Sequence, residues 1–412
     1  MGDKANKTVK NTIYNTIGTF AYFFFQWITT VVVVRLTGYK DAGVFSLVVS
    51  FTNVFGFISR YGMRNYQISD YNDVFSNHQY LGARIWTTGI AIAGFFIVSL
   101  FCGFDAYTYV CALAYMIFKL LESLTDYLFA IFQKLDKYKE MAISYILKGI
   151  LPLLGFIGCL WMFKSLLSAI CCMALLYAAI VLCYDFPCVK ARKTLRVSFQ
   201  GNKKILSACL PLMLATLITP YMTFIIRFFI EKLYGEEMLG YYSSISMVVV
   251  VMTTLAGSVW YVIIPIISKH YTEENFGAII RMLIGILLAI AGIGVVVIAL
   301  GEWLGPWAFR LVFGSEILAY MYLLAPVLIA SILLTATAFF STVLIPLQRR
   351  GAMLWCNVIG AAVCTAAVYP MTKADGMQGA NNSLILGLTI QLLLLGGVTF
   401  FTLKQKEARK NG

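Results

Sequence analysis

The segment IYNTIGTFAYFFFQWITTVVVV occupies residues 13–34 and contains no charged side chain. A helix of this length, rising 1.5 Å per residue, crosses about 30 Å of hydrocarbon. The segment is too long for the core of a signal peptide, and no small-residue cleavage site follows it. We therefore expect it to be an uncleaved first membrane span.

Similar apolar runs recur to the other end of the 412-residue chain, which is 60% hydrophobic and only 12% charged. Soluble proteins average about 25% charged residues, so a soluble fold could not cover its surface with polar groups. The sequence predicts an all-α, polytopic membrane protein with about twelve spans. These are expected near residues 12–34, 42–59, 85–103, 107–126, 141–163, 165–184, 207–230, 239–267, 278–301, 317–346, 352–370 and 380–403.

The distribution of Lys and Arg predicts the orientation of these spans. With the N-terminus in the cytoplasm, the cytoplasmic segments hold about four times as many basic residues as the external ones. This bias predicts that both termini are cytoplasmic, and it accounts for the net charge of +13 without a nucleic-acid partner.

A short repeat divides the chain into two halves. LTGYKDAGVFS at residues 36–46 matches LYGEEMLGYYS at residues 233–243, with an offset of 197 throughout. Each copy links the first and second predicted spans of its half, and we expect the glycines to shape moving turns. The predicted turn glycines are Gly38, Gly43, Gly235 and Gly240. We predict an N-terminal lobe at 1–184, a basic cytoplasmic linker at 185–206 and a C-terminal lobe at 207–412, related as a parallel repeat.

The linker holds the richest basic stretch of the chain: Lys190, Arg192, Lys193, Arg196, Lys203 and Lys204. Basic residues are typical of cytoplasmic loops, and they also attract anionic lipid head groups. Direct contact with the head group of a substrate is the alternative interpretation.

Ionisable residues inside spans are costly and therefore mark candidate functional sites. Lys119, Glu122 and Asp126 follow one another at spacings of three and four, which places them on one helical face. One interpretation is an internal salt bridge between Lys119 and Glu122. The other is a relay that couples transport to a proton or sodium gradient. Lys148, in the fifth span, is a further charge at membrane depth.

Three arginines are candidates for binding an anion. Arg60 and Arg64 follow the second span at helical spacing, within a polar and aromatic segment. They form either an ordinary basic loop or a port for phosphate and sugar, since a planar guanidinium suits phosphate well. Arg227 lies in the seventh span, where it either pairs with Glu231 and reaches the interface or faces an anion in a cavity.

The sequence offers no catalytic or metal-binding pattern. The ten cysteines show no metal-ligand spacing, and His78 and His270 both fall in polar loops. No P-loop, zinc-protease or serine-hydrolase motif is present, and no external loop is large enough for a polymerase site. We expect neither an enzyme nor a cofactor.

Three segments resemble a known family. They are YGMRNYQISD at residues 61–70 followed by YLGARI at 80–85, RFFIEKLYGEEMLGYYS at 227–243, and the turn with Gln133 and Lys137. Together they resemble bacterial polysaccharide flippases of the Wzx type, in the multidrug/oligosaccharidyl-lipid/polysaccharide (MOP) exporter superfamily. The resemblance covers the whole chain in span number and two-lobe layout.

The resemblance implies an inverted-V transporter of the bacterial plasma membrane, with a cationic cavity between two six-helix lobes. The implied cargo is an undecaprenyl-diphosphate-linked oligosaccharide. Arg60, Arg64 and Arg227 would receive its diphosphate and Arg84 would assist, while Tyr66, Gln67 and Tyr242 would contact the glycan. The implied protein is a monomer that works beside a polysaccharide polymerase and glycosyltransferases.

One residue departs from the family pattern. Many relatives carry an acidic residue before the arginine that matches Arg227, whereas Ile226 stands here. Glu122 and Asp126 remain the candidates for ion coupling, with Lys119 beside them. A drug exporter of the same superfamily is the nearest alternative, but we expect it to carry a carboxylate in the first span, and residues 13–34 contain none. A membrane enzyme acting on the same glycolipid is a further alternative.

Overall fold

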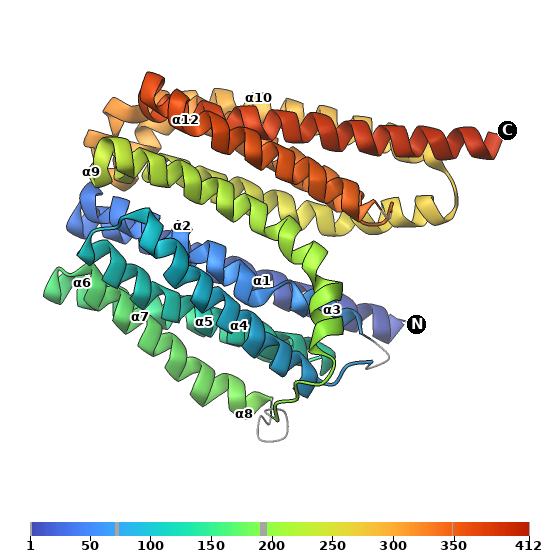
Figure 1. Cartoon of the computed structure of the whole chain (residues 1–412), viewed down its shortest axis with the longest axis horizontal. Helices are drawn as coiled ribbons and strands as arrows, with labels where there is room; N and C mark the ends of the chain where they lie inside the picture. Colours follow the sequence, from blue (N-terminus) through green and yellow to red (C-terminus); the bar gives the residue numbers. More distant parts are fainter. Residues whose placement is uncertain (1, 71–73, 190–195, 348, 412) are drawn as a thin grey trace. The chain divides into compact units, whose positions relative to one another are not determined.

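The chain is all-helical in its computed structural model, which describes residues 2–70, 74–189, 196–347 and 349–411 (Figure 1). Residues 190–195 of the predicted basic linker and Gln348 lie outside the described residues. The helices are α1 Gly2–Thr37, α2 Tyr39–Arg60, α3 Met63–Ser69, α4 Asn77–Cys102, α5 Ala106–Lys134, α6 Tyr138–Phe163, α7 Leu166–Ile180, η1 Val181–Asp185, α8 Phe186–Cys188, α9 Asn202–Thr272, α10 Phe276–Phe313, η3 Glu316–Leu323, α11 Leu324–Val343 and α12 Arg350–Asn411.

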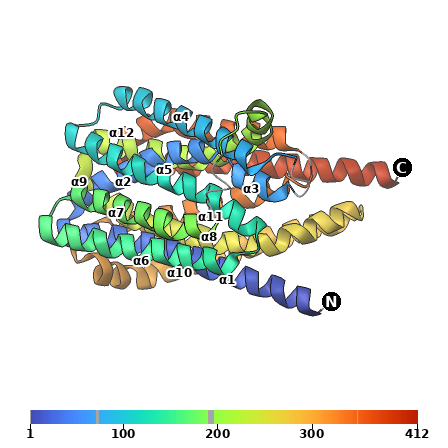
Figure 2. The ribbon, with the colours of Figure 1, turned by 90° about the horizontal axis from the view of Figure 1, so that it is seen from below.

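The chain forms two compact units, residues 1–220 and 221–412, and the boundary falls inside α9. In the first unit α5 packs against α2 and α7, while α6 packs between α1 and α7. Figure 2 shows α4, α5, α6 and α7 running side by side. In the second unit α11 packs against both α10 and α12.

Ten stretches of the described chain are long and apolar enough to cross a membrane. The sequence predicted twelve, and the difference arises at two places where a pair of predicted spans belongs to one continuous helix. α9 covers both 207–230 and 239–267, and α12 covers both 352–370 and 380–403. Each of these long helices is interrupted by non-helical backbone, at Gly235 in α9 and at Asp375 and Gly376 in α12.

The two arms of α12 fold back on each other. Figure 1 shows them side by side, and the amide nitrogen of Gln391 donates to the Asn357 side-chain oxygen at 2.8 Å. Gly360 and Gly387 allow close contact, because a Cβ on Gly360 would lie 3.0 Å from the Gly387 carbonyl oxygen. In the first unit only Lys164 and Ser165 separate α6 from α7: Lys164 is left-handed (φ 45°), and the Ser165 side chain caps α7.

The repeat predicted from sequence has a conformational counterpart. Gly38, between α1 and α2, has φ 90° and ψ −177°, and Gly235, 197 residues later, has φ 87° and ψ 173°. This region of backbone conformation is essentially restricted to glycine. The partner glycines Gly43 and Gly240 are buried in the helices that follow. The matching sequences therefore build matching turns, and their movement during transport stays a prediction.

Alanine at either turn should lower stability through backbone strain alone, because a Cβ at Gly38 or Gly235 would meet no atom within 4 Å. We expect Gly38→Ala and Gly235→Ala each to cost about 1–3 kcal/mol, seen as a lower melting temperature in detergent. Gly89→Ala is the control, since this helical glycine is equally open but has no positive φ. Equal melting temperatures for all three variants would contradict this account of the turns.

Candidate functional site

Arg84 of α4 joins three helices inside the first unit. It is 3% exposed, and one terminal nitrogen donates to the carbonyl oxygen of Arg60 at 2.8 Å, at the end of α2. The same nitrogen lies 3.3 Å from the hydroxyl of Ser123 on α5. The other terminal nitrogen binds the carboxylate of Asp126 at 3.0 Å. Arg84 thus satisfies backbone groups that the end of α2 leaves open while neutralising a carboxylate of α5.

Arg64 of α3 approaches the same carboxylate from another side. Its guanidinium lies 3.7 Å from Asp126 and donates to Gln133 at 3.3 Å and to the Tyr145 hydroxyl at 3.2 Å. It also lies over the ring of Phe129, 5.6 Å from the centroid. Arg64 remains 20% exposed, so it is held in place without being sealed from a ligand.

Glu122 is the centre of a second group of contacts on α5. Lys119 binds one of its oxygens at 2.7 Å, which confirms the salt bridge expected from their spacing. The hydroxyl of Tyr22 donates to the other oxygen, and Gln26 donates to that hydroxyl at 2.9 Å. The carboxylate is therefore fully paired, and Arg60 is close enough to interact with it electrostatically.

A third ion pair joins Lys148 of α6 to Asp185 of η1, and both side chains are completely buried. Ser144 donates to the second Asp185 oxygen at 2.6 Å, and the Lys148 ammonium also donates to Thr125 at 3.0 Å. Asp185 ends a π-helical turn, a feature frequent at functional sites. Sequence reasoning missed this carboxylate, although Asp185 is the only acidic residue between positions 141 and 230.

These contacts define an interior charge cluster in the first unit. It brings together several predicted site residues with two residues that the sequence did not connect to them. Its members are Arg60, Arg64, Arg84, Lys119, Lys148, Glu122, Asp126 and Asp185.

Arg60 is the member of the cluster whose side chain stays unneutralised. Its guanidinium lies over the ring of Phe57, 4.5 Å from the centroid. Among the described residues it has neither an ion pair nor a side-chain hydrogen bond. It is half-buried at the last position of α2.

Two residues predicted to contact the cargo, Gln67 and Arg84, instead form hydrogen bonds with other protein groups. Gln67 is fully buried, and its amide nitrogen donates to Asn77 at 2.9 Å. Arg84 is buried in the contacts described above. Tyr66, in contrast, is 37% exposed. Cargo binding by these residues stays a prediction, and the structure favours a supporting role for Gln67 and Arg84.

Asp70 fixes the connection between α3 and α4 outside the spans. Its carboxylate accepts hydrogen bonds from the backbone nitrogens of Val74 at 2.9 Å and Phe75 at 3.0 Å, and from the Tyr80 hydroxyl at 3.0 Å. Partial burial acts to raise the pKa of Asp70, but these bonds to the charged form outweigh it and leave the pKa lowered. The ionised carboxylate therefore anchors α3, which carries Arg64 and Tyr66.

Arg227 belongs to the second unit. It interacts electrostatically with Tyr242, a buried residue whose hydroxyl donates to Asn381 at 3.4 Å. Ile226, at the position where relatives are expected to carry an acid, is 1% exposed. The pairing of Arg227 with Glu231 stays a prediction.

The described chain is an all-helical, polytopic membrane protein with a charge cluster inside its first unit. Residues 8–271 match the family described as "Polysaccharide biosynthesis protein", and the chain belongs to this family. It is 26% identical to the "Capsular polysaccharide biosynthesis protein CapF" of Staphylococcus aureus over 321 residues, 75% of this chain and 78% of the relative. The resemblance expected from the sequence is confirmed.

Solved structures support the fold over nearly the whole chain. The inward-facing form of a multidrug resistance MATE family transporter of the MOP superfamily has a TM-score of 0.66 at 13% identity, covering 95% of this chain and 96% of that one. The bent form of the Vibrio cholerae MATE transporter VcmN has a TM-score of 0.60 at 12% identity, covering 99% and 98%. At such identities the likeness shows the fold, which is MATE-like.

The buried pair predicts a large and specific loss of stability. Lys148→Met leaves the Asp185 carboxylate buried without its cation, and breaking a buried ion pair in this way costs about 3–5 kcal/mol. Adding Asp185→Leu to the same protein should recover most of the loss. Melting temperature in detergent is the measurement.

Lys139→Met is the matched control, because Lys139 is an exposed lysine on the same helix. If Lys148→Met melts at the same temperature as Lys139→Met, Lys148 and Asp185 do not form a stabilising pair.

Proposed function

We propose that this protein flips an undecaprenyl-diphosphate-linked oligosaccharide from the cytoplasmic to the outer leaflet of the bacterial plasma membrane. It does so by alternating access and without covalent chemistry, and both of its termini are cytoplasmic. Membership of the polysaccharide biosynthesis family supports the cargo class, and the MATE-like fold supports the mode of action. A relative named for capsular polysaccharide biosynthesis is consistent with a cell-surface polymer.

The observation that carries the proposal is the charge balance of the interior cluster. Its five cations face three carboxylates, Glu122, Asp126 and Asp185, which leaves two positive charges. A diphosphate brings about two negative charges, which hydrocarbon does not accept unpaired. The cargo and the cluster together are close to neutral. Binding the diphosphate would therefore balance the two positive charges that the internal salt bridges leave over.

Arg60 is the first contact in this proposal. Its guanidinium forms no ion pair with a carboxylate of the described residues, and a planar guanidinium can bind two phosphate oxygens at once. Arg64 follows, since it is partly exposed and its carboxylate at 3.7 Å is shared with Arg84. Arg227 receives the diphosphate at a later stage. Tyr66 offers an exposed ring for the glycan.

The interrupted helices support twelve spans in two lobes of six. A straight helix of the 62 residues in α12 would measure about 93 Å, three times the hydrocarbon thickness. Crossing once before and once after the break fits the membrane, and the same holds for α9 around Gly235. We propose lobes at 1–184 and 207–412 with 185–206 as the linker; the first compact unit of the structure extends further, to residue 220. We propose that the protein works as a monomer beside glycosyltransferases and a polymerase.

Ion coupling places a specific demand on α5. Glu122 is fully paired with Lys119 and Tyr22, so a proton or sodium ion acts there only if that pairing opens during the cycle. Asp126 is 17% exposed and shared by two arginines, which makes it the more accessible of the two carboxylates.

The direct test is transport in liposomes with a fluorescent undecaprenyl-diphosphate oligosaccharide. Removing a hydrogen bond to a charged group costs about 1.5–3 kcal/mol, so Arg60→Ala should slow flipping roughly 10- to 100-fold. Arg227→Ala should also slow it. Lys139→Ala, which removes an exposed cation of the same unit, should flip at the wild-type rate.

The outcomes separate the function from the site. If wild-type protein moves the lipid and Arg60→Ala keeps pace with it, Arg60 does not receive the diphosphate. If folded wild-type protein moves no lipid-linked glycan under any ion gradient, the proposed function itself is wrong.

A further inference from the structure

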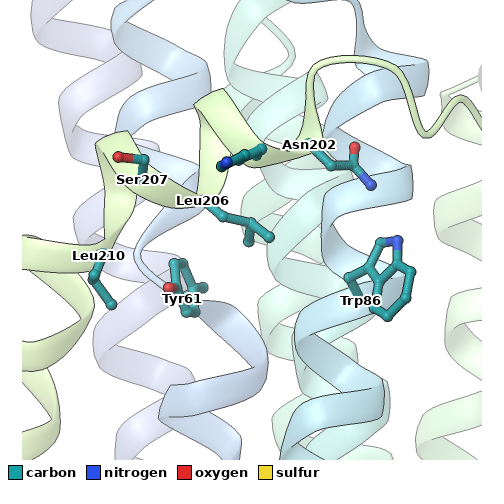
Figure 3. A pocket seen from close by; sticks show the side chains of 7 residues that line it. Tyr61, Trp86, Asn202, Leu206, Ser207 and Leu210 are labelled. Carbon is teal, nitrogen blue, oxygen red and sulfur yellow. The ribbon is translucent and has the colours of Figure 1, made fainter.

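A pocket of about 380 Å³ lies at the start of α9, apart from the interior charge cluster (Figure 3). It is lined by Tyr61, Trp86, Asn202, Lys203, Leu206, Ser207 and Leu210, from the α2–α3 turn, from α4 and from α9. All of these residues belong to the first unit. Its size suits a small-molecule head group.

The pocket is built by close backbone packing. The Ser198 nitrogen donates to the His78 carbonyl oxygen at 3.1 Å, and a Cβ on Gly82 would lie only 2.1 Å from the Ser198 carbonyl oxygen. Glycine at position 82 therefore lets the segment before α9 lie directly on α4. On the other side, two successive left-handed residues, Tyr61 (φ 54°) and Gly62 (φ 65°), turn the chain so that Tyr61 lines the pocket.

Asn202 supplies the decisive observation. Its side chain is 8% exposed, and neither its amide oxygen nor its amide nitrogen has a hydrogen-bond partner within the described part of the chain. An unsatisfied buried polar group costs about 1–3 kcal/mol. Figure 3 shows the amide at the pocket wall above the indole of Trp86. A ligand with hydrogen-bonding oxygens would satisfy it.

The electrostatics of the pocket favour an anion. Asn202 is the first residue of α9, so the positive end of the helix dipole lies there, with the N–H groups of the first turn that precede Lys204 and Ile205, whose own N–H groups donate to Gly201. Lys203 adds a positive charge to the lining. No lining residue is acidic, and neither α4 nor α9 up to residue 230 contains an Asp or Glu.

The pocket also changes character along its length. Asn202 lies at the end of a candidate span, while Leu206 and Leu210 lie one and two turns further in, with Leu210 and Trp86 exposed at 40% and 57%. Polar groups at the membrane surface above exposed apolar groups match a lipid, whose phosphate is followed by acyl chains. A soluble anion would leave Leu206, Leu210 and Trp86 without an apolar contact.

We infer that this pocket binds the phosphate of an anionic phospholipid of the surrounding bilayer. The phosphate accepts hydrogen bonds from the Asn202 amide and the first backbone N–H groups of α9, and it pairs with Lys203. The glycerol and the first acyl carbons lie along Leu206, Leu210 and Trp86. The site is distinct from the proposed cargo cluster and does not depend on the flippase function.

The test is retention of phosphatidylglycerol by the full-length protein, measured by native mass spectrometry from detergent, with phosphatidylcholine as the neutral comparison. We expect wild-type protein to prefer phosphatidylglycerol at least fivefold. Asn202→Leu and Lys203→Glu should each abolish that preference. Lys204→Glu, an exposed neighbour that does not line the pocket, should keep it.

Melting curves distinguish loss of lipid binding from loss of folding in the Asn202→Leu variant. Asn202→Leu removes unsatisfied polar atoms, so it should fold and should lose the rise in melting temperature that phosphatidylglycerol gives the wild type. The inference is overturned if the wild type shows no preference, if Lys203→Glu and Lys204→Glu behave alike, or if Asn202→Leu retains the lipid.

Two further arms identify the source of the phosphate. Inorganic phosphate at millimolar concentration should neither displace the lipid nor raise the melting temperature, and if it does so the site binds a soluble anion instead. Undecaprenyl phosphate should not displace phosphatidylglycerol at equal concentration. If it does, the pocket belongs to the cargo and the inference is wrong.

Discussion

The contact between Arg84 and Asp126 is the constraint around which the first unit is arranged. A charge inside a membrane protein must be paired, and the backbone groups at a helix end must also find partners. Arg84 meets both needs, because it binds the Asp126 carboxylate and the last carbonyl oxygens of α2. This fixes where α2 ends against α4 and α5, and so it fixes the position of Arg60. Loss of Arg84 would leave the carboxylate and the carbonyl groups unsatisfied together, which is why we regard it as a positioning residue.

The same need for pairing divides the remaining charges into two kinds. Lys148 and Asp185 are fully buried and satisfy each other with help from Ser144, as an element of structure does. Arg60 and Arg64 lie at the edge of the cluster and are partly exposed. The cluster's carboxylates do not balance the positive charge of both guanidinium groups. The proposed transport of a diphosphate would use this asymmetry, because a cluster that was neutral on its own could not balance the charge of the cargo. The buried ion pair Lys148–Asp185 therefore stabilises the helix packing, and in the proposal the unbalanced positive charge of Arg60 and Arg64 binds the ligand.

Much of this arrangement could be predicted from sequence, for local reasons. Residues 36–46 and 233–243 match because both must place a glycine at φ near 90°, and a steric requirement of that kind is visible in the residue itself. The Lys119–Glu122 pair followed from helical spacing. Asp185 was missed because its partner, Lys148, lies on another helix and no spacing rule joins them. The burial of Gln67 and Arg84 could not be predicted either, since it depends on contacts with other helices: Gln67 binds Asn77 of α4, and Arg84 binds α2 and α5. The sequence also did not predict that α9 and α12 each continue through two predicted spans. A single non-helical residue such as Gly235 interrupts the helix, and helical structure resumes directly after it.

The chain direction after α2 ties the two candidate binding regions together. Arg60 and Tyr61 are consecutive, yet Arg60 acts electrostatically on Glu122 while Tyr61 lines the pocket at the start of α9. The left-handed conformation of Tyr61 and Gly62 makes this division possible, since a continued helix would carry both side chains around the same axis. A lipid phosphate bound by Asn202 and Lys203 would lie near Tyr61, and a diphosphate bound by Arg60 would lie near the preceding residue. In the two proposals, the lipid phosphate and the cargo diphosphate would therefore each lie beside this two-residue turn.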